Sequence, residues 1–377
     1  MTGSRPSRPP RRQRRERAPR GASHVGERFE AEVGPVAHGG HCVVRHDDRV
    51  VFVRHALPGE RVVVVVTEGR DGDRFWRGDA ESVLVASPDR VEPPCPYAGP
   101  GLCGGCDFQH VTPAGQRALK AAVVREQLSR LAGLDLPVAV EEVPPSLRWR
   151  TRMRYVALPG GGRGLHVHRS DEVVEIDDCL LDAGGPTRVR ESVETTHGSH
   201  DFVVDPDGFW QSHVEAPRLL VETVLSMLAP QPGERVLDLY AGVGLFAAFL
   251  ADAVGLAGRV VAVEGSPQAC RDARANLAPQ VQVTQGAVDR VLAASYDEPF
   301  DLVVLDPPRE GARRTVVEQV ADRAPRAIAY VACDPAALAR DLATFAGSGY
   351  SLRELRAFDL FPMTNHVECV ALLERDR

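Results

Sequence analysis

The sequence predicts a doubly wound α/β domain with a mainly parallel sheet, preceded by a small β-barrel. After residue 214, apolar strand-like runs alternate with helical segments to the end of the chain. The stretch DLYAGVGLFAAFLA, residues 238–251, has the pattern of a strand, a tight glycine turn and a helix. Before residue 87, short valine-rich runs are separated by Gly, Pro and Asp at the spacing of a small barrel.

Length and composition are those of a globular protein of two or three domains, with 377 residues, 44% hydrophobic and 26% charged. No apolar run reaches the length of a membrane span. The N-terminus is rich in arginine and lacks the apolar stretch of a secretory signal, so we expect a cytoplasmic protein, and a monomer. Its eight cysteines are then expected to be free, metal-bound or catalytic.

Four regions follow from the pattern. Residues 1–26 are predicted to be a disordered tail: the first 20 carry eight Arg and one Glu, and they form either an electrostatic arm for nucleic acid or an unconstrained extension. Residues 27–86 form the barrel, and residues 87–208 a central domain with a Cys/Pro/Gly-rich loop, a helix over 114–132 and strand-like alternation over 147–176. Residues 209–377 form the α/β domain, with strands RVLDLY, VVAVE, VQVTQ, DLVVLD, AIAYVAC and ECVALLE.

The glycine turn of the α/β domain predicts a nucleoside-binding crevice. Gly242 and Gly244 let the backbone approach a ligand at a helix N-terminus, and Glu264 ends the next strand, where an acid binds ribose hydroxyls. Ala247 replaces the third glycine of the dinucleotide fingerprint, which favours S-adenosylmethionine over NAD. Asp306-Pro307-Pro308 follows a further strand and is typical of nucleic-acid methyltransferases; Arg309 stands where adenine-N6 enzymes usually have an aromatic residue.

Cys333 ends an apolar strand and precedes Asp-Pro and a helical pattern. A free cysteine in such a place is usually inert core, so its neighbours alone leave both an inert and a nucleophilic role open. The N-terminus of the following helix favours a thiolate, and Asp334 opposes one.

Two motifs, DPPREG at 306–311 and FDLFPMTNHVE at 358–368, resemble those of the bacterial RNA uridine-5-methyltransferase family. ALPGERVVV is similar to the TRAM domain, a small RNA-binding barrel, and CGGCDFQH to the iron–sulfur segment of the branch that modifies 23S ribosomal RNA. The resemblance implies a class I S-adenosylmethionine-dependent methyltransferase domain (Rossmann-like), an N-terminal TRAM β-barrel and a small α+β iron–sulfur central domain.

The resemblance also implies roles for single residues. A thiolate that adds to C6 of uracil makes C5 nucleophilic, and a base must then remove the C5 proton. Cys333 matches the nucleophile and Glu368 the base. Gln211, Tyr240, Glu264 and Asp306 match positions that contact the methyl donor. The chain departs from the family at Leu245, His213, Ala332 and Asp334, where Asn, Asn, Ser and Asn are usual.

Three cysteines, Cys95, Cys103 and Cys106, lie within twelve residues, and Cys179 is a natural fourth. Four thiolates bind either zinc or an iron–sulfur cluster, and the spacing alone leaves both open. The family resemblance implies a [4Fe–4S] cluster.

The stretch LRWRTRMRY, residues 147–155, predicts a strand with Arg148, Arg150, Arg152 and Arg154 on one face. Such a face is a candidate for binding RNA phosphates, or else a solvated surface paired with local acids. We expect ribosomal RNA as the substrate, with transfer RNA possible. An adenine-N6 methyltransferase and a non-catalytic RNA-binding protein are the alternatives.

Overall fold

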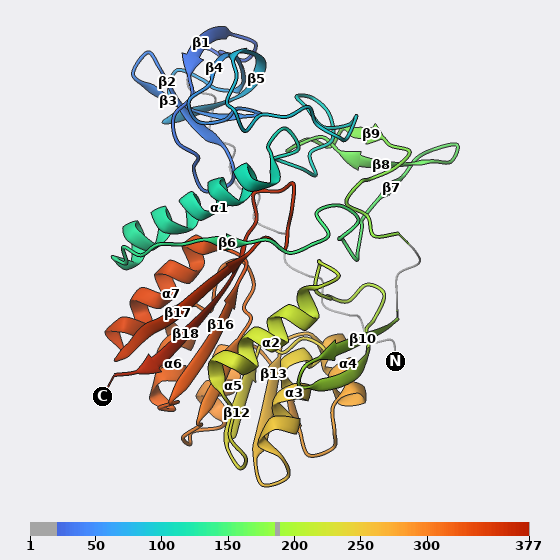
Figure 1. Ribbon diagram of the computed structural model, residues 1–377, viewed down its shortest axis with the longest axis vertical. Helices are drawn as coiled ribbons and strands as arrows, with labels where there is room; N and C mark the ends of the chain where they lie inside the picture. The colour runs from blue at the N-terminus through green and yellow to red at the C-terminus, as the bar shows by residue number, and fades with distance from the viewer. Residues whose placement is uncertain (1–20, 185–188, 377) are drawn as a thin grey trace, which may run out of the picture.

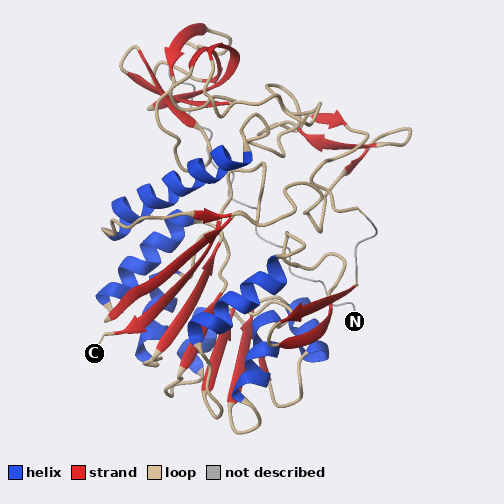
Figure 2. Cartoon of the chain, viewed as in Figure 1, coloured by secondary structure: helices blue, strands red, loops and turns tan. Residues whose placement is uncertain are grey.

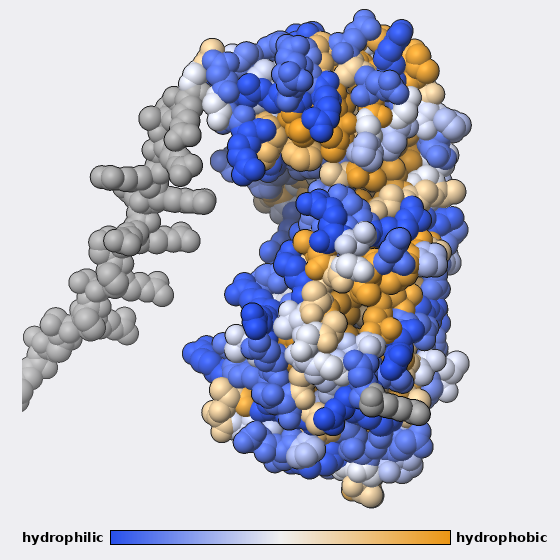
Figure 3. All heavy atoms as spheres, turned by 90° about the vertical axis from the view of Figure 1, so that its left-hand side faces the viewer, coloured by the Kyte–Doolittle hydropathy of each residue, from blue (hydrophilic) through white to orange (hydrophobic). Residues whose placement is uncertain are grey.

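The computed structural model describes residues 21–184 and 189–376. A small barrel lies at one end of the molecule, a large α/β part at the other, and irregular segments with one long helix lie between them (Figure 1). Seen from the side, the outline is hollowed between these two ends (Figure 3). Among the described residues, no helix combines the length and the apolar character needed to cross a lipid bilayer.

The barrel has five strands in the order β1-β4-β5-β3-β2. Their bounds are β1 Arg28–Glu32, β2 Cys42–His46, β3 Arg49–Arg54, β4 Arg61–Glu68 and β5 Phe75–Val85. Alternation of side chains explains its core: Val62, Val64 and Val66 of β4 are buried, and the residues between them face outward.

The predicted tail, residues 1–26, falls largely on residues 1–20, which lie outside the described residues. Residues 21–26 are not a free tail. The Ala22 amide donates to Asp71 Oδ2 at 2.8 Å, and Ser23 forms a bridge with Arg70. The barrel therefore begins a few residues earlier than the charge pattern suggested.

The central region carries the predicted helix, α1 (Pro113–Gln127), which continues as the π-helical segment η1 (Leu128–Ala132). Thr112 caps it by accepting from the Gly115 amide at 3.1 Å, and a proline at the first position fits a helix start. A three-stranded sheet and a hairpin complete the region: β7 Val156–Ala157, β8 Arg163–His166, β9 Val173–Glu175, β10 Arg190–Thr195 and β11 Gly198–Val203.

Residues 147–155 do not form the predicted strand. Only Arg150 takes part in β-pairing, through isolated bridges to Asp182 and His213, and Arg148 has a φ of 58°. The reason is that the backbone of residues 148–151 bonds to two separate segments. The Arg148 amide donates to the Leu180 carbonyl and the Thr151 amide to the Ser212 carbonyl, each at 2.8 Å, so the pairing is limited to isolated bridges. Arg152 Nη1 adds bonds to the carbonyls of residues 205, 206 and 208 at 2.7–3.1 Å.

The α/β part is one eight-stranded sheet in the order β14-β13-β12-β15-β16-β18-β17-β6. Six strands match the predicted ones: β12 Arg235–Leu239, β13 Arg259–Glu264, β14 Gln282–Gln285, β15 Leu302–Leu305, β16 Ala327–Ala332 and β18 Glu368–Arg375. Two were not predicted, β17 Tyr350–Phe358 and β6 Val140–Glu141, the latter contributed by the central region. β18 runs antiparallel to both of its neighbours.

Helices cover both faces of this sheet (Figure 2). They are α2 Ala216–Leu228, α3 Leu245–Val254, α4 Pro267–Asn276, α5 Val288–Ala294, α6 Arg313–Asp322 and α7 Pro335–Gly347. All residues of β15 and β16 are buried, as expected for strands covered on both faces. The candidate site lies at the end of this sheet where its parallel strands finish.

Candidate active site

The predicted catalytic and cofactor residues gather at one edge of the sheet. The parallel strands end there, and β18, which runs the other way, begins there. In the order of the strands, this edge carries Glu264 on β13, Tyr240 and Gly242 after β12, Asp306 after β15, Cys333 after β16 and Glu368 on β18.

These six residues and Gln211 line one cavity of about 960 Å³. Gly244 does not line it. This glycine begins α3 with a φ of 93°, and an added Cβ would lie 2.8 Å from a methyl carbon of Leu277. Gly244 is therefore required for a turn and for close packing, and the structure does not place it among the groups that face a ligand.

The half of the cavity near β13 and β12 holds an oriented carboxylate. Glu264 accepts from the Gly242 amide at 2.9 Å and from the Ser266 amide at 2.6 Å. Further along the edge, Gln211 Nε2 donates to Asp306 Oδ2 at 3.2 Å. Burial raises the pKa of Asp306 to about 7. The side chains of Glu264 and Asp306 are thus both held by hydrogen bonds from the protein itself.

Strand register brings Cys333 and Glu368 together. Ala332 of β16 pairs with Cys369 of β18, so the residues one step further, Cys333 and Glu368, lie across from each other. Directly opposed residues on antiparallel strands have Cβ atoms about 5 Å apart. A thiol and a carboxyl group therefore face the same small volume, although 35 positions separate them in the chain.

The thiol of Cys333 is hard to ionise in this structure. Burial is the main cause that raises its pKa to about 12, and Glu368, Asp306 and Asp334 add to the effect, while Arg309 opposes it. From the sequence, the helix N-terminus was expected to favour the thiolate and Asp334 to oppose it. In the structure Asp334 caps α7, accepting from the Ala337 amide at 2.8 Å, and its carboxylate raises the pKa of the thiol.

Glu368 is buried, and burial, helped by Asp306, raises its pKa well above the ordinary value. A carboxylate is a stronger base when its pKa is raised toward neutrality. The pair therefore consists of a protonated thiol and a carboxyl group whose burial favours its protonated form.

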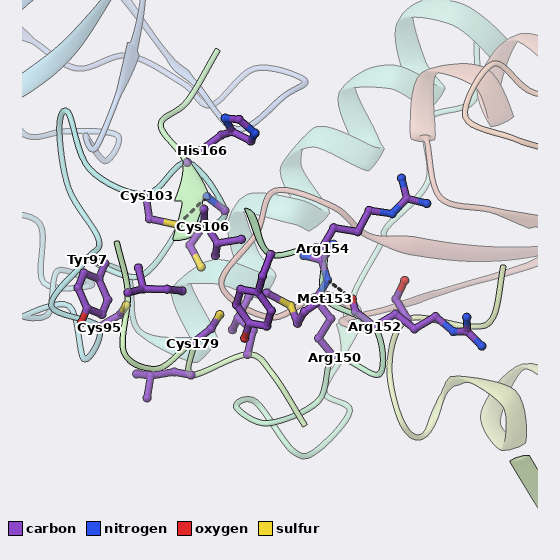
Figure 4. Close-up of a pocket in the computed structure, with 18 of the residues that line it drawn as sticks. Cys95, Tyr97, Cys103, Cys106, Arg150, Arg152, Met153, Arg154, His166 and Cys179 are labelled. Carbon is purple, nitrogen blue, oxygen red and sulfur yellow. Dashed lines mark hydrogen bonds between the residues drawn. The ribbon is translucent and has the colours of Figure 1, made fainter. Parts of the chain in front are cut away.

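A second cavity, of about 1190 Å³, lies beside the first. Its lining includes all four predicted cluster cysteines, Cys95, Cys103, Cys106 and Cys179, whose sulfurs point toward a shared space (Figure 4). Each of the first three thiols has its pKa raised by burial and by the neighbouring thiols. Within the described residues, no three His, Cys, Asp or Glu side chains are placed to hold a single metal ion.

The four predicted RNA-binding arginines have different surroundings. Arg148 forms an ion pair with Asp178, and Arg152 holds the carbonyls of the 205–208 loop. Arg150 Nε donates to the Arg152 carbonyl at 3.2 Å. Arg154 is exposed and lines the second cavity with Arg150 and Arg152. Three of the four arginines therefore line one cavity, and Arg148 is not among the residues that line it.

Arg309 is a site residue that we did not assign from the sequence. It lines both cavities, it is the cation that lowers the pKa of Cys333, and its Nη2 lies 3.2 Å from His366 Nε2. The signal was present, because Arg309 belongs to DPPREG and His366 to FDLFPMTNHVE. Phe209, 68% exposed, also borders both cavities.

Three of the departures from the family pattern lie at described, well-defined positions. His213 is buried, accepts from the Glu215 amide at 3.1 Å and stacks on Trp149 with ring centroids 5.6 Å apart. Leu245 lines the first cavity, and Ala332 is buried at the end of β16. None of these three removes a group from the Cys333–Glu368 pair.

Comparison with known proteins agrees with this geometry. A family model described as tRNA (Uracil-5-)-methyltransferase matches residues 288–376, a methyltransferase small domain matches 202–330, and a TRAM domain matches 22–79. An RNA methyltransferase of Streptomyces avermitilis is 44% identical over 93% of this chain and 99% of its own length. The 23S rRNA (uracil(1939)-C(5))-methyltransferase RlmD of Alkalilimnicola ehrlichii is 31% identical over 93% and 97%. The chain belongs to the RNA uracil-5-methyltransferase family.

The fold agrees as well. The structure of a Pyrococcus abyssi tRNA (uracil-54, C5)-methyltransferase, in complex with S-adenosyl-L-homocysteine, superposes with a TM-score of 0.68. It is 20% identical and covers 92% of this chain and 100% of its own. The predicted methyltransferase domain and TRAM barrel are thus confirmed, and this uracil-5-methyltransferase is an enzyme.

Proposed function

We propose that this uracil-5-methyltransferase transfers a methyl group from S-adenosylmethionine to C5 of a uridine in RNA through a transient bond between Cys333 and C6. The observation that carries the proposal is the juxtaposition of Cys333 and Glu368 across β16 and β18. The bound donor supplies an electrophilic methyl group. In this proposal Glu264 orients the ribose of the donor, and Gln211 and Asp306 bind near its reacting end; all three line the same cavity.

The residues act in a fixed order. The Cys333 thiol gives its proton to solvent water, and its sulfur adds to C6. The displaced electron pair moves through the ring so that C5 attacks the methyl carbon of the donor, which leaves as S-adenosylhomocysteine. Glu368, in its carboxylate form, then takes the proton from C5, and the returning electron pair expels the sulfur of Cys333. The raised pKa of Glu368 suits this step, since a buried carboxylate holds the proton it receives.

Ribosomal RNA is our proposed substrate. The TRAM barrel and the cysteine cavity accompany the methyltransferase domain, and the relative from Alkalilimnicola ehrlichii is named for 23S rRNA. Transfer RNA is the alternative, because one matching family model is described by a tRNA activity. A buried target base must leave its stack to meet Cys333, which favours loop or single-stranded RNA. Arg150 and Arg154, which line the adjoining cavity, are candidates for phosphate contacts.

Replacing Glu368 with glutamine should trap the covalent intermediate. Without the carboxylate, the C5 proton stays and the sulfur cannot leave, so incubation with total RNA and S-adenosylmethionine should yield a denaturant-resistant protein–RNA adduct. The matched control, Glu374→Gln, changes an exposed residue of the same strand and should yield none. The proposal fails if Glu368→Gln yields no adduct under conditions in which the wild type methylates C5. Sequencing of the trapped RNA identifies its class.

We also propose that the four cysteines hold a [4Fe–4S] cluster. Four free thiols line one cavity, which is the donor set such a cluster needs. Zinc would require four sulfurs about 2.3 Å from one point, and the described residues offer no single-ion cage. A cluster of four irons is wider and spreads its ligands further apart.

Anaerobically purified protein should therefore contain about four iron atoms per chain together with acid-labile sulfide. Cys179→Ser should lose both, whereas Cys42→Ala, which removes a barrel-core cysteine, should retain them. Stoichiometric zinc without iron would contradict the assignment. A cytoplasmic location and a monomeric state stay predictions from the sequence.

A further inference from the structure

One turn of the barrel reaches the catalytic edge of the sheet. This barrel turn, residues 37–41 with the sequence AHGGH, is closed by the Ala37 amide donating to the His41 carbonyl at 2.7 Å. The Gly40 amide donates to the Ala37 carbonyl at 3.0 Å. The closed turn projects from the barrel and presents the His38 side chain to the methyltransferase domain.

Two contacts join the barrel turn to the segments that carry the catalytic pair. His38 Nε2 lies 3.0 Å from Oδ2 of Asp334, the residue after Cys333. Gly40 has a φ of 80°, and an added Cβ would lie 2.5 Å from the Asn365 Cβ, so the turn packs directly on the segment that leads to Glu368. The barrel is therefore in contact with both sides of the active site.

A second link fixes the barrel in this place. Arg54 of β3 pairs with Asp107 at 3.4 Å, and Asp107 Oδ2 accepts from the amide and the side chain of Asn365 at 3.0 and 2.8 Å. The same motif segment is thus held from the barrel by a chain of charged and polar groups. Such a link keeps His38 close to Asp334.

The contact between His38 and Asp334 matters because of the negative charge around Cys333. Glu368, Asp306 and Asp334 all disfavour a thiolate there, and Arg309 is the cation that favours one. Asp334 is an acid where the family usually has a neutral asparagine, so this chain carries one more negative charge beside its nucleophile than the family pattern does. His38 is the side chain that pairs with that charge.

We propose that His38 is a positioning residue of the active site, whose imidazolium pairs with Asp334 and thereby offsets the negative charge next to the Cys333 sulfur. This inference rests on the proposed role of Cys333 as the nucleophile. It assigns the barrel a part in catalysis besides RNA binding, and it explains how the chain tolerates an aspartate at position 334.

The pairing predicts a pH dependence. The hydrogen bond to Asp334 raises the pKa of His38 above 6.5, Glu126 adds to this effect, and burial and Arg340 oppose it. Burial alone would raise the pKa of Asp334, but the bond to His38, the capping bond to the Ala337 amide and the charge of Arg340 together lower it. The imidazolium therefore persists to a higher pH than that of an unpaired histidine, and its effect on Cys333 disappears as the pH rises above the pKa of His38.

The test measures iodoacetamide alkylation of Cys333 by peptide mass spectrometry, without RNA or methyl donor, between pH 6 and 9. His38→Gln keeps a polar contact with Asp334 but not the charge, and it should react about threefold more slowly near neutral pH, a shift of about half a pH unit in the thiol titration. The wild-type and variant rates should converge at alkaline pH. Asp334→Asn, whose side chain can still cap α7, is introduced into the wild type and into His38→Gln. The resulting two proteins should then have the same alkylation rate.

Two further measurements distinguish the loss of the His38 charge from an unspecific effect of changing the barrel. His24→Ala removes a barrel histidine that pairs with Glu27 and Asp71 and should leave the alkylation rate of Cys333 unchanged. In methylation assays, His38→Gln should lower kcat near neutral pH and leave KM for RNA unchanged, unlike a loss of RNA binding.

Equal alkylation of the wild type and His38→Gln at every pH would overturn the inference, as would a slow rate that Asp334→Asn does not restore. Either result leaves the adduct formed by Glu368→Gln unaffected. Conversely, methylation that survives Cys333→Ala would reject the proposed nucleophile whatever His38 does.

Discussion

Cys333→Ala should lower the rate of uridine methylation by at least about 10⁴-fold, the order of loss seen when a covalent nucleophile is removed. Cys333 is the thiol that lines the cavity together with Glu368 among the described residues. Cys369, the next residue of β18, is fully buried and points to the opposite face of the strand. Without the sulfur, C5 of uracil is too weak a nucleophile to attack the methyl donor. The measurement is transfer of radiolabelled methyl groups to RNA that lacks the modification.

Two further variants show whether the loss of methylation in Cys333→Ala is due to the missing nucleophile. Cys333→Ser keeps the size of the side chain but not its nucleophilicity, so it should be as inactive as alanine. Cys42→Ala removes a sulfur from the barrel core and should keep activity within a fewfold of the wild type. Both Cys333 variants should still bind S-adenosylmethionine, because that half of the cavity is built from other strands. Activity of Cys333→Ala within tenfold of the wild type would rule out the covalent route.

The strands that could be predicted are those buried on both faces. β13, β15 and β16 are near-continuous apolar runs, and a pattern of apolar runs between helices specifies them. β17 was missed because its middle is polar and partly exposed, as in SLRELRAF. β6 was missed because it has two residues and is a strand only through pairing with Ala357 and Phe358 of β17.

The proposed catalytic pair rests on the family resemblance, because Glu368 ends the motif at 358–368 and Cys333 follows an apolar strand between the two motifs. The arginine stretch could not be interpreted in the same way. Alternation in the sequence indicates a strand only when the backbone pairs continuously with one neighbour. Here residues 148–151 bond partly to residues 180–181 and partly to residues 212–214, which the sequence pattern does not reveal. His38 carried no signal at all, because its partner Asp334 lies 296 positions away and only the folded chain brings the two together.

The direction of the pKa shift of Cys333, the proposed nucleophile, could not be settled from the sequence. From the sequence, a helix N-terminus beside Cys333 suggested a lowered thiol pKa. In the structure the first-turn amide of Ala337 is bound by Asp334, and burial raises the pKa of the thiol to about 12. The local motif predicted the helix, but the balance of burial and surrounding carboxylates depends on other strands of the sheet.

Lys120→Met should lower the free energy of unfolding by about 3–5 kcal/mol, because it leaves a buried carboxylate without its partner. Lys120, on α1, is fully buried, and its Nζ lies 2.6 Å from Asp359 Oδ1 and 2.9 Å from the Phe361 carbonyl. Both partners belong to the motif segment that ends at Glu368. We therefore expect a loss of methylation along with the loss of stability, measured by urea unfolding and by the methyl-transfer assay.

The same helix supplies a matched control. Arg117 pairs with Glu142 at 3.1 Å, but this pair is partly exposed, so Arg117→Ala should cost no more than about 1 kcal/mol. Lys120→Met combined with Asp359→Asn should recover part of the stability, since no charge then remains buried. Lys120 is also the sole lysine of the chain, so its labelling by an amine reagent reports directly on this contact, and Asp359→Asn should accelerate that labelling. If Lys120→Met and Arg117→Ala destabilised the protein equally, α1 would not be held to the catalytic segment by the Lys120–Asp359 pair.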